Sequence, residues 1–477
     1  MDKKQLIVLG AGPGGYAAAF QAANLGIDVT LIDPKPDPGG VCLFHGCIPT
    51  KALLHFARIR EEAEHAGEWG LSFSGLKVDI DKVRGWKESV VKQLTGGLGQ
   101  LARSRKVNYM QGKARLTGSN SIEFTPVNGK KGGAEGEKQE IDFENLIIAT
   151  GAAPGDIDGL PFDGDRVMNA EAALELKDIP KKLLVVGAGY IGLEMSVIYK
   201  ALGSDITIAE FTSDILPGTD ADLREVFKKE RKDLMEKIMF STKVSSGSVK
   251  GKKVTVEFEN TDGEKSSDTF DRVLVSIGGK PNTSAIGLEE AGVETDDRGF
   301  VKVDLVRRTN VNGIYAIGDI TGQPMLAHKA SHEGRVAAEH IAGHKTAYEP
   351  KAIPAVVFTD PEIAWTGLTE TGAKEQGIEY EVAKFPWAAS GRAVTLGVKN
   401  GLTKLLIDPK TDRLLGAAMV GKDAGSLVSE ATLAIEMGAV ARDLELTVHP
   451  HPTLSETLME AAEVYYGHAT HIHKRKK

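Results

Sequence analysis

The sequence carries one glycine fingerprint twice, each time in the same strand–turn–helix pattern. The first copy is Gly10-x-Gly12-x-x-Gly15 and the second is Gly187-x-Gly189-x-x-Gly192, and each follows a short apolar segment. An acidic residue closes the next apolar segment, Asp33 in one copy and Glu210 in the other. The glycines allow a tight turn beside a helix N-terminus that holds a pyrophosphate, and the acid accepts from ribose hydroxyls. A glycine-rich turn without a ligand is the alternative for a lone copy, but the flanking strand, helix and acid favour a nucleotide. Two copies therefore predict two Rossmann-like dinucleotide sites.

Glu210 also predicts which nucleotide the second site takes. A carboxylate there bonds the ribose 2′-hydroxyl of NAD and repels the 2′-phosphate of NADP. The next four residues, 211–214, contain no Arg that would hold a phosphate. NAD is therefore the predicted nucleotide. Tyr190, inside the second fingerprint, either gates the nicotinamide pocket or simply packs.

Both cysteines of the chain, Cys42 and Cys47, stand in the segment 39–51, soon after the first nucleotide unit. Four intervening residues allow a small disulfide, and strained or exposed disulfides are the labile, catalytic ones. Gly40 lets the backbone approach a bound group. If the helix predicted over 52–66 reaches back through Cys47, Lys51 faces the same side, and its ammonium favours the thiolate. The alternatives are inert core cysteines, part of a metal site, or a structural staple. The neighbouring nucleotide unit favours the redox interpretation.

The overall composition narrows the class of protein. A net charge of −8 and a pI near 5.9 make nucleic acid an unexpected partner. We find no apolar run of about 18 residues, the length of a membrane span, and no signal peptide before the first strand. We therefore expect a cytoplasmic protein, and in that compartment a cysteine pair is more often catalytic than structural.

The other elements are predicted from apolar periodicity. Helical spacing over 83–101 indicates a core helix, and the polar segment 128–138 indicates an exposed loop. Further strands are expected at 107–110, 114–116, 121–124, 144–148, 254–258, 272–277, 402–407 and 414–420. A strand at 313–319 ends in Asp319, whose carboxylate either accepts from sugar or ribityl hydroxyls or caps the next helix. A helix over 427–437 completes an α+β unit that begins near 356.

Taken together, these motifs resemble the pyridine nucleotide–disulfide oxidoreductases over essentially the whole chain, and within that family the branch that oxidises dihydrolipoamide. The resemblance rests on both fingerprints, Cys42-x4-Cys47 and Ala316-Ile317-Gly318-Asp319. It is supported by the segments 322–328, 385–392 and 449–456. Two pairs depart from the family pattern: Phe44-His45 replaces a pair that usually begins with Asn, and Gly279-Lys280 replaces an Arg-containing turn.

The resemblance implies site residues for both cofactors. For FAD these are Gly10, Gly12, Gly15, Asp33, Gly40, Lys51, Ala114, Thr150, Gly151, Asp319, Met325, Leu326, Ala327 and His328. For NAD they are Gly187, Gly189, Tyr190, Ile191, Gly192, Glu210, Val244 and Gly278. Catalytic roles fall to Cys42 as the thiol that meets the substrate and to Cys47 as the thiol next to the flavin. Lys51 pairs with Glu194. His451 serves as acid–base, oriented by Glu456, and comes from the other subunit of a homodimer.

The implied fold is α/β: two Rossmann-like domains and a C-terminal α+β dimerisation domain. The domains would span 1–150 (FAD), 151–280 (NAD), 281–350 (FAD, continued) and 351–477 (dimerisation). The implied activity is oxidation of dihydrolipoamide, carried by 2-oxo acid dehydrogenase complexes or the glycine cleavage system, with reduction of NAD+. We expect no metal site. The tail with His468, His471 and His473 could bind one but is more simply a frayed basic end.

Rival activities differ in features of the sequence. A glutathione reductase would need NADP-binding Arg residues after the second fingerprint, and this chain has none there. Mercuric and large thioredoxin reductases need additional C-terminal thiols, but Cys42 and Cys47 are the only cysteines of this chain. A soluble transhydrogenase lacks the cysteine pair. A flavoprotein whose main role is docking to an assembly would not need Cys42, Cys47, His451 and Glu456 together.

Overall fold

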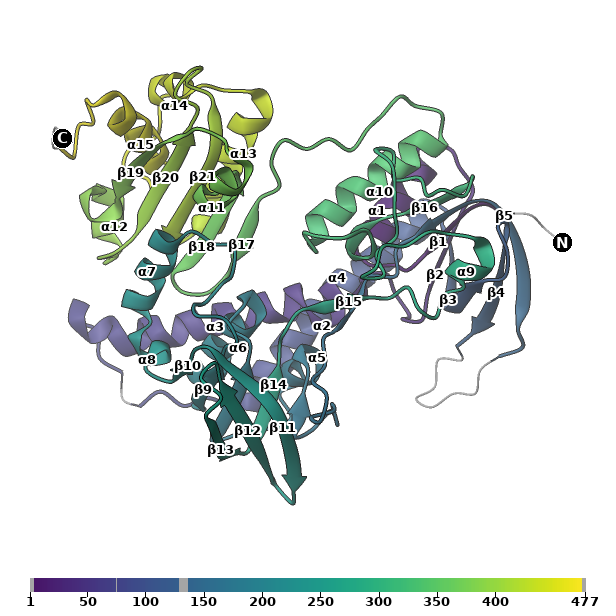
Figure 1. Ribbon diagram of the computed structural model, residues 1–477, viewed down its shortest axis with the longest axis horizontal. Coiled ribbons are helices and arrows are strands. Elements are labelled where there is room, and N and C mark those ends of the chain that lie inside the picture. Colours follow the sequence, from purple (N-terminus) through teal and green to yellow (C-terminus); the bar gives the residue numbers. More distant parts are fainter. Residues whose placement is uncertain (1–3, 74, 128–135, 474–477) are drawn as a thin grey trace.

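A computed structural model describes residues 4–73, 75–127 and 136–473. Figure 1 shows three bodies, which we call the first domain, the second domain and the C-terminal domain. The first domain is built on a six-stranded sheet, the second on a five-stranded sheet and the C-terminal domain on another five-stranded sheet. None of the helices in these described ranges is long and apolar enough to cross a membrane.

The first domain has a mainly parallel sheet of buried apolar strands. The strands are β1 (Lys4–Leu9), β2 (Val29–Asp33), β3 (Asn108–Leu116), β4 (Ser121–Pro126), β5 (Gln139–Ile148) and β16 (Ile314–Ala316). β2, β1, β5 and β16 run parallel, so the chain returns to this sheet after the whole second domain. Helices α1 (Pro13–Asn24) and α10 (Ala327–Ile341) pack closely, since a Cβ on Gly334 would lie 2.5 Å from the Gly14 oxygen.

Three helices lead from the first domain toward the other two. They are α2 (Gly40–His45), α3 (Cys47–His65) and α4 (Ile80–Ser104), with the short η1 (Ala66–Trp69) after α3. α3 packs against α4 and against the second domain's α6 (Tyr190–Ala201). Asp79 caps α4 by accepting from the Lys82 amide at 3.1 Å. Because α3 contacts both domains, residues at its N-terminus lie at their junction.

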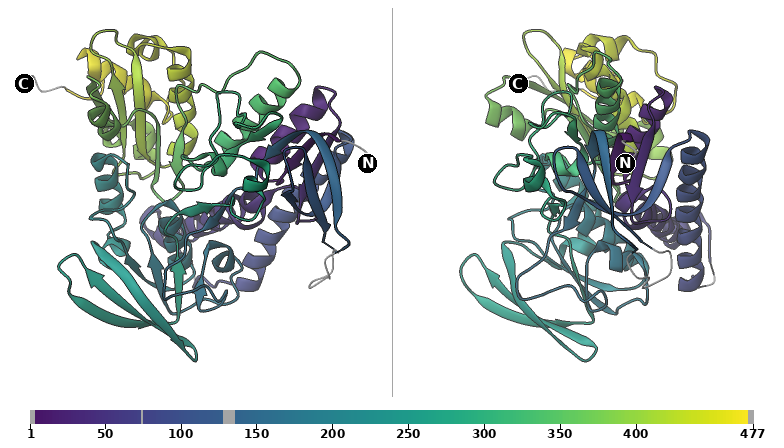
Figure 2. Two further views of the ribbon diagram at one scale, coloured as in Figure 1. Left: turned by 45° about the vertical axis from the view of Figure 1, so that its right-hand side comes forward. Right: turned by 90° about the vertical axis from the view of Figure 1, so that its right-hand side faces the viewer.

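The second domain repeats the pattern of the first. Its parallel sheet has the order β10 (Ile238–Met239), β9 (Asp205–Ala209), β8 (Lys182–Val186), β14 (Arg272–Val275) and β7 (Val167–Met168). A second, antiparallel sheet of β11 (Thr242–Lys250), β12 (Lys253–Asn260) and β13 (Lys265–Phe270) projects from it (Figure 2). Its helices are α5 (Ala170–Leu174), α6, α7 (Ala221–Glu230) and α8 (Lys232–Met235). Strands β6 (Ala152–Pro154) and β15 (Gly279–Pro281) pair where the chain enters and leaves it, and α9 (Leu288–Ala291) follows.

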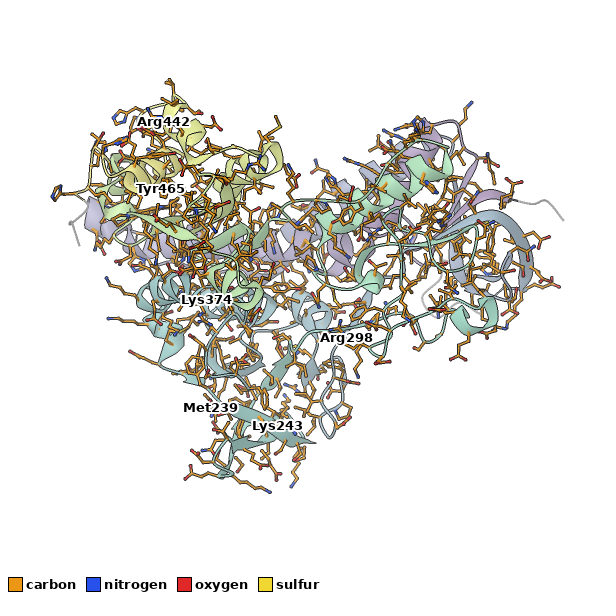
Figure 3. All side chains as sticks on the ribbon, turned by 45° about the horizontal axis from the view of Figure 1, so that its top comes forward. Met239, Lys243, Arg298, Lys374, Arg442 and Tyr465 are labelled. Atoms are coloured by element: carbon orange, nitrogen blue, oxygen red, sulfur yellow. The ribbon has the colours of Figure 1, made fainter. Side chains whose placement is uncertain are left out.

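The C-terminal domain is an antiparallel sheet covered by helices. Its strand order is β17 (Ala355–Val357), β18 (Glu362–Gly367), β21 (Leu414–Gly421), β20 (Leu402–Ile407) and β19 (Glu381–Pro386). Its helices are α11 (Glu370–Gln376), α12 (Gly391–Thr395), α13 (Ala424–Met437), α14 (Ala441–Leu446) and α15 (Glu456–Tyr466), with η3 (Trp387–Ala389) between strands. Figure 3 shows Arg442 and Tyr465 on this domain, well away from Met239 of β10 and Lys243 of β11 in the second domain.

The predicted elements differ from the observed ones in several places. The two strands expected at 107–110 and 114–116 form the single strand β3, because Gln111 continues the pairing with β2 and Gly112 and Lys113 begin the pairing with β4. Asp319 does not cap α10 as one interpretation had it: it lies inside the 3-10 helix η2 (Gly318–Thr321), and Leu326 is the N-cap of α10. Most of the predicted loop at 128–138 lies outside the described residues.

The prediction of a frayed C-terminal end is wrong for His468 and His471. His468 Nε2 lies 2.6 Å from Glu445 Oε1, and His471 Nδ1 bonds Glu460. His468 also stacks on the Tyr466 ring. These carboxylates and the aromatic ring hold the chain against α14 and α15. The sequence pattern of the tail alone could not show these contacts with other segments.

Candidate active site

The two glycine fingerprints adopt the same backbone geometry. Gly10 has φ +101° and Gly187 has φ +100°, a region that favours glycine. A Cβ on the third glycine of either copy would lie 1.8 Å (Gly15) or 1.9 Å (Gly192) from the first glycine's oxygen. The helices that follow, α1 and α6, have no side-chain cap at their N-termini. Both turns therefore present helix N-terminal amides, which suits a pyrophosphate.

The acids after the fingerprints are also equivalent. The Ala11 amide donates to Asp33 Oδ2 at 2.8 Å, and the Ala188 amide donates to Glu210 Oε2 at 2.6 Å. Burial raises the pKa of Asp33, and the backbone amides of Ala11 and Lys35, which donate to its carboxylate, partly offset this. Glu210 Oε1 also accepts from the amide and hydroxyl of Thr212, both at 2.7 Å. Each carboxylate is thus held rigidly at its sheet edge, where ribose hydroxyls would meet it.

The segment that carries the cysteines packs directly on the first fingerprint. The Gly39 amide donates to the Ala11 oxygen at 2.8 Å. Gly40 has φ +57°, and a Cβ there would lie 2.5 Å from the Gly12 Cα. Only glycine permits this approach, so Gly40 places α2 and its thiol against the turn that would hold the nucleotide.

Cys42 and Cys47 are free thiols in this structure; Cys42 lies within α2, and Cys47 begins α3, which packs against α2. The pKa of Cys47 is lowered to about 7: the hydrogen bond from Cys42 and then the charge of Lys51 lower it, and together they outweigh burial, which raises it. The same hydrogen bond and burial raise the pKa of Cys42. Cys47 is the first residue of α3, a position that also favours a thiolate. In the reduced pair the negative charge therefore resides on Cys47.

Lys51 lies one turn after Cys47 on α3 and pairs with Glu194 of α6. The Lys51 ammonium is 2.9 Å from Glu194 Oε2 and 3.1 Å from Oε1, and the Glu194 side chain is only 3% exposed. The pair joins two residues 143 positions apart. It brings a cation to the thiol and ties the first fingerprint's domain to the second.

Asp319 lies on η2 with its carboxylate bonded by none of the described residues, and burial raises its pKa. The turn around it is fixed by Glu333, which is fully buried. Glu333 accepts from the Gly318 amide at 2.7 Å and pairs with Arg307 at 2.9 Å. Lys329 donates to the Gly318 oxygen at 3.0 Å. This buried network, which sequence reasoning missed, holds Asp319 ready for a polar ligand.

Two tyrosines lie near the thiols. Burial is the main cause that raises the pKa of Tyr190, followed by the charges of Asp319, Glu194 and Cys47. Tyr190 is nevertheless 47% exposed, so its ring stands at the mouth of the junction. Tyr16, which the sequence did not single out, has its pKa raised by burial and by Cys42 and Cys47. The charges of the thiols thus influence a tyrosine at each fingerprint.

His451 lies between α14 and α15 on the C-terminal domain. Its Nδ1 is 2.9 Å from Glu456 Oε1, while Glu456 Oε2 accepts from the Thr453 amide at 2.7 Å. The His451 side chain is 72% exposed. Figure 1 shows α14 and α15 at the end of this domain remote from α2. Within one chain the structure therefore does not bring His451 to the cysteines.

Comparisons with known proteins identify the family. A model of the pyridine nucleotide-disulphide oxidoreductases matches residues 4–334, and a model of their dimerisation domain matches residues 353–462. This chain belongs to the pyridine nucleotide-disulphide oxidoreductases.

The relatives span the whole chain. It is 48% identical to a dihydrolipoyl dehydrogenase of Vibrio cholerae, which covers 99% of this chain and 98% of the relative. A Bacillus subtilis protein of that name is 44% identical, covering 98% and 97%. Among solved structures, LpdA from Mycobacterium tuberculosis matches with a TM-score of 0.87 and 27% identity, covering 97% of this chain and 99% of LpdA. The predicted family and fold class are confirmed.

As a member of this family the chain is a flavoprotein oxidoreductase that uses FAD and NAD. The residues present fit FAD: the N-terminus of α1 has no side-chain cap, Gly40 closely approaches Gly12, and the buried Asp319 carboxylate accepts from none of the described residues. Glu210 and the second fingerprint offer the same elements for NAD.

The remaining predicted site residues are distributed as follows. Thr150 donates to the Asn282 oxygen at 2.9 Å, and Gly151 and Gly278 have positive φ. Met325 precedes α10, Leu326 is its N-cap, and Ala327 and His328 are its first two residues; His328 Nε2 lies 2.8 Å from the Pro354 oxygen. Ala114 lies in β3 and Ile191 in α6. Val244 is a buried member of the hydrophobic core, so its side chain is not available to a ligand.

The two departures from the family pattern make ordinary contacts. His45 Nε2 lies 2.7 Å from Lys35 Nζ and 3.1 Å from Glu171 of α5, and burial lowers the pKa of His45. Lys280 pairs with Asp156 at 2.6 Å on the surface. His45 therefore links α2 to the second domain through Glu171.

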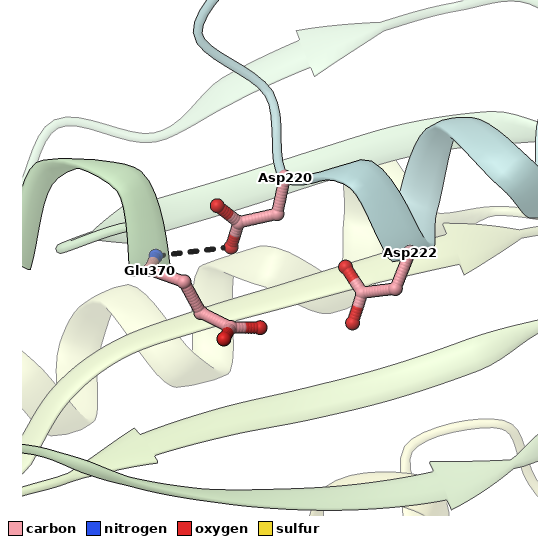
Figure 4. Close-up of side chains that lie close together, drawn as sticks. All are labelled: Asp220, Asp222 and Glu370. Atoms are coloured by element: carbon pink, nitrogen blue, oxygen red, sulfur yellow. Dashed lines mark hydrogen bonds between the residues drawn. The ribbon is translucent and has the colours of Figure 1, made fainter. Parts of the chain in front are cut away.

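A cluster of carboxylates lies where the second and C-terminal domains meet. Figure 4 shows Asp220 and Asp222 of the α7 end facing Glu370 of α11. The ammonium of Lys404, which is fully buried, lies 2.6, 2.8 and 2.9 Å from these three groups. Because that cation uses all three of its donors here, the cluster is an interdomain ion-pair network.

Replacing Lys404 by Met should destabilise the protein by about 3 kcal/mol, because it leaves buried carboxylates without their partner. Urea unfolding of the FAD-loaded protein measures this. The matched control is Lys384→Met, since Lys384 reaches Asp222 from the same sheet but is 43% exposed, and should cost less than about 1 kcal/mol. Equal losses in the two variants would contradict the assignment.

Proposed function

We propose that this protein oxidises protein-bound dihydrolipoamide to lipoamide and reduces NAD+ to NADH. The observation that carries the proposal is the ion pair between Lys51 and Glu194. One lysine links the thiolate-favouring Cys47, packed beside the first fingerprint, to Glu194 on the helix of the second. The names of full-length relatives support the same substrate.

We assign the domains accordingly. Residues 1–150 and 281–350 form the FAD domain, since β16 completes the first sheet. Residues 151–280 form the NAD domain, and 351–477 the dimerisation domain. Gly10, Gly12, Gly15, Asp33, Gly40 and Asp319 would hold FAD, and Gly187, Gly189, Tyr190, Gly192 and Glu210 would hold NAD. When bound, FAD carries the two electrons from the reduced cysteine pair to NAD+.

The thiol chemistry follows from the side chains. In the oxidised enzyme Cys42 and Cys47 share a disulfide bond. Glu456 holds Nδ1 of His451, so Nε2 is free to take a proton from the first substrate thiol. The substrate thiolate attacks Cys42 Sγ, the Cys42–Cys47 bond breaks, and Cys47 leaves as a thiolate.

The second substrate thiol then attacks the substrate sulfur of the mixed disulfide. The cyclic disulfide is released, and the proton of that thiol ends on Cys42. One proton thus remains on His451 and one on Cys42, while Cys47 carries the negative charge. The opposite pKa shifts of the two cysteines match this distribution of charge.

The exposed position of His451 supports a homodimer in which each subunit supplies His451 and Glu456 to the other's Cys42. Docking of lipoyl domains from 2-oxo acid dehydrogenase complexes or the glycine cleavage system then delivers the substrate, in the cytoplasm.

The test compares substrate pairs on the purified yellow protein. We expect NAD+ reduction by dihydrolipoamide, with kcat/KM at least about 100-fold above that for NADP+, because Glu210 repels a 2′-phosphate. Glu210→Gln should lower the ratio of kcat/KM for NAD+ to kcat/KM for NADP+. Turnover only of NADPH with glutathione disulfide would overturn both substrate and nucleotide, while leaving the fold and the thiol chemistry intact.

A further inference from the structure

Phe358 brings the C-terminal domain to the redox centre. It follows β17, and its amide donates to Glu194 Oε1 at 3.0 Å. Its ring lies under the Lys51 ammonium, 4.4 Å from Nζ to the ring centroid. Three domains therefore meet at one ion pair: Lys51 from the first, Glu194 from the second and Phe358 from the third.

The arrangement gives the Lys51 ammonium two attractive contacts. It pairs with the Glu194 carboxylate and also lies over the negative face of the Phe358 ring. Lys51 is 33% exposed, and a lysine stem has several rotatable bonds, so without a second contact the ammonium could swing toward solvent. The ring restricts the ammonium to the Glu194 side, where it also faces Cys47.

Phe358 does not serve as core packing. It is 36% exposed and belongs to none of the hydrophobic clusters formed by the described residues, whereas its neighbour Val357 is buried in one. An aromatic ring held at the surface by a backbone hydrogen bond and directed at a cation indicates a role in placing that cation.

We infer that Phe358 is a positioning residue: it holds the Lys51 ammonium beside Glu194 and Cys47, so that the C-terminal domain helps to tune the redox pair. The inference rests on the proposed function for its purpose but not for its geometry. The charge of Lys51 is one of the causes that lower the pKa of Cys47, so displacing the ammonium should make the thiolate less abundant near pH 7.

The experiment measures alkylation of Cys47 in the reduced, FAD-loaded enzyme against pH, with Cys42 and Cys47 distinguished by peptide mass spectrometry. Phe358→Leu removes the ring and keeps an apolar side chain. In this variant we expect the rate of Cys47 alkylation at pH 7 to fall about threefold to tenfold. The midpoint of the plot of this rate against pH should move to higher pH. Phe358→Tyr keeps the ring face and should behave as the unaltered enzyme. If Phe358→Leu loses FAD, Phe358→Met takes its place.

A double-substitution cycle tests whether the effect passes through Lys51. In a Lys51→Met background, Phe358→Leu should change the alkylation rate no further. A persisting effect, or equal rates for Phe358→Leu and Phe358→Tyr, would overturn the inference. A lack of dihydrolipoamide turnover in the unaltered enzyme would refute the proposed function. The alkylation result would still test the role of Phe358, because alkylation needs no lipoyl substrate.

Discussion

Replacing Cys47 by Ser should lower dihydrolipoamide turnover by at least about a thousandfold, because an alcohol cannot form the disulfide that accepts the electrons. Cys47 is the thiol with the pKa of about 7, held between Cys42 and Lys51, so no other group replaces it. The rate of NADH formation measures the loss. Binding of FAD should survive, since the substitution removes no contact between Gly40 and the first fingerprint.

The control is the oxidation of NADH by a one-electron dye, which does not need the disulfide. The Cys47→Ser variant should retain it, and this separates loss of the thiol from loss of the fold. Dihydrolipoamide turnover that matched the unaltered enzyme would contradict the disulfide mechanism.

Replacing His451 by Gln should lower turnover by about a hundredfold to ten-thousandfold, the usual range for loss of a general base. Gln can keep a hydrogen bond to Glu456 but cannot take the substrate proton. A matched control is His449→Gln, two residues away: His449 is buried against Glu430 at 2.8 Å and should affect stability more than turnover.

Hybrid dimers decide whether His451 acts across the subunit interface. A dimer of one His451→Gln chain and one Cys42→Ser chain contains an intact Cys42 facing an intact His451 only if the histidine serves the other subunit. Recovery of activity on mixing the two inactive variants is expected. An inactive hybrid, with dimerisation verified, would place His451 in the same subunit as its Cys42.

Short-range patterns determined much of this protein. The duplicated fingerprint, its spacing to Asp33 and Glu210, and the Cys42-x4-Cys47 pair depend on local chain geometry, so the sequence alone predicted them. The confirmed family, fold class and cofactors all follow from those motifs. The helix expected to reach back to Cys47 does so, because α3 begins at that residue.

Long-range contacts were decided only by the tertiary structure. Glu333 beneath Asp319, Lys404 among three carboxylates and Phe358 under Lys51 join elements far apart in the chain, and no periodicity in one segment reports on another. The same reason explains the bonded tail histidines and the single strand β3. Burial and electrostatic pairing depend on which surfaces meet after folding. The sequence thus determined which chemical groups this protein has, and the packing of its three domains determined which of them act together.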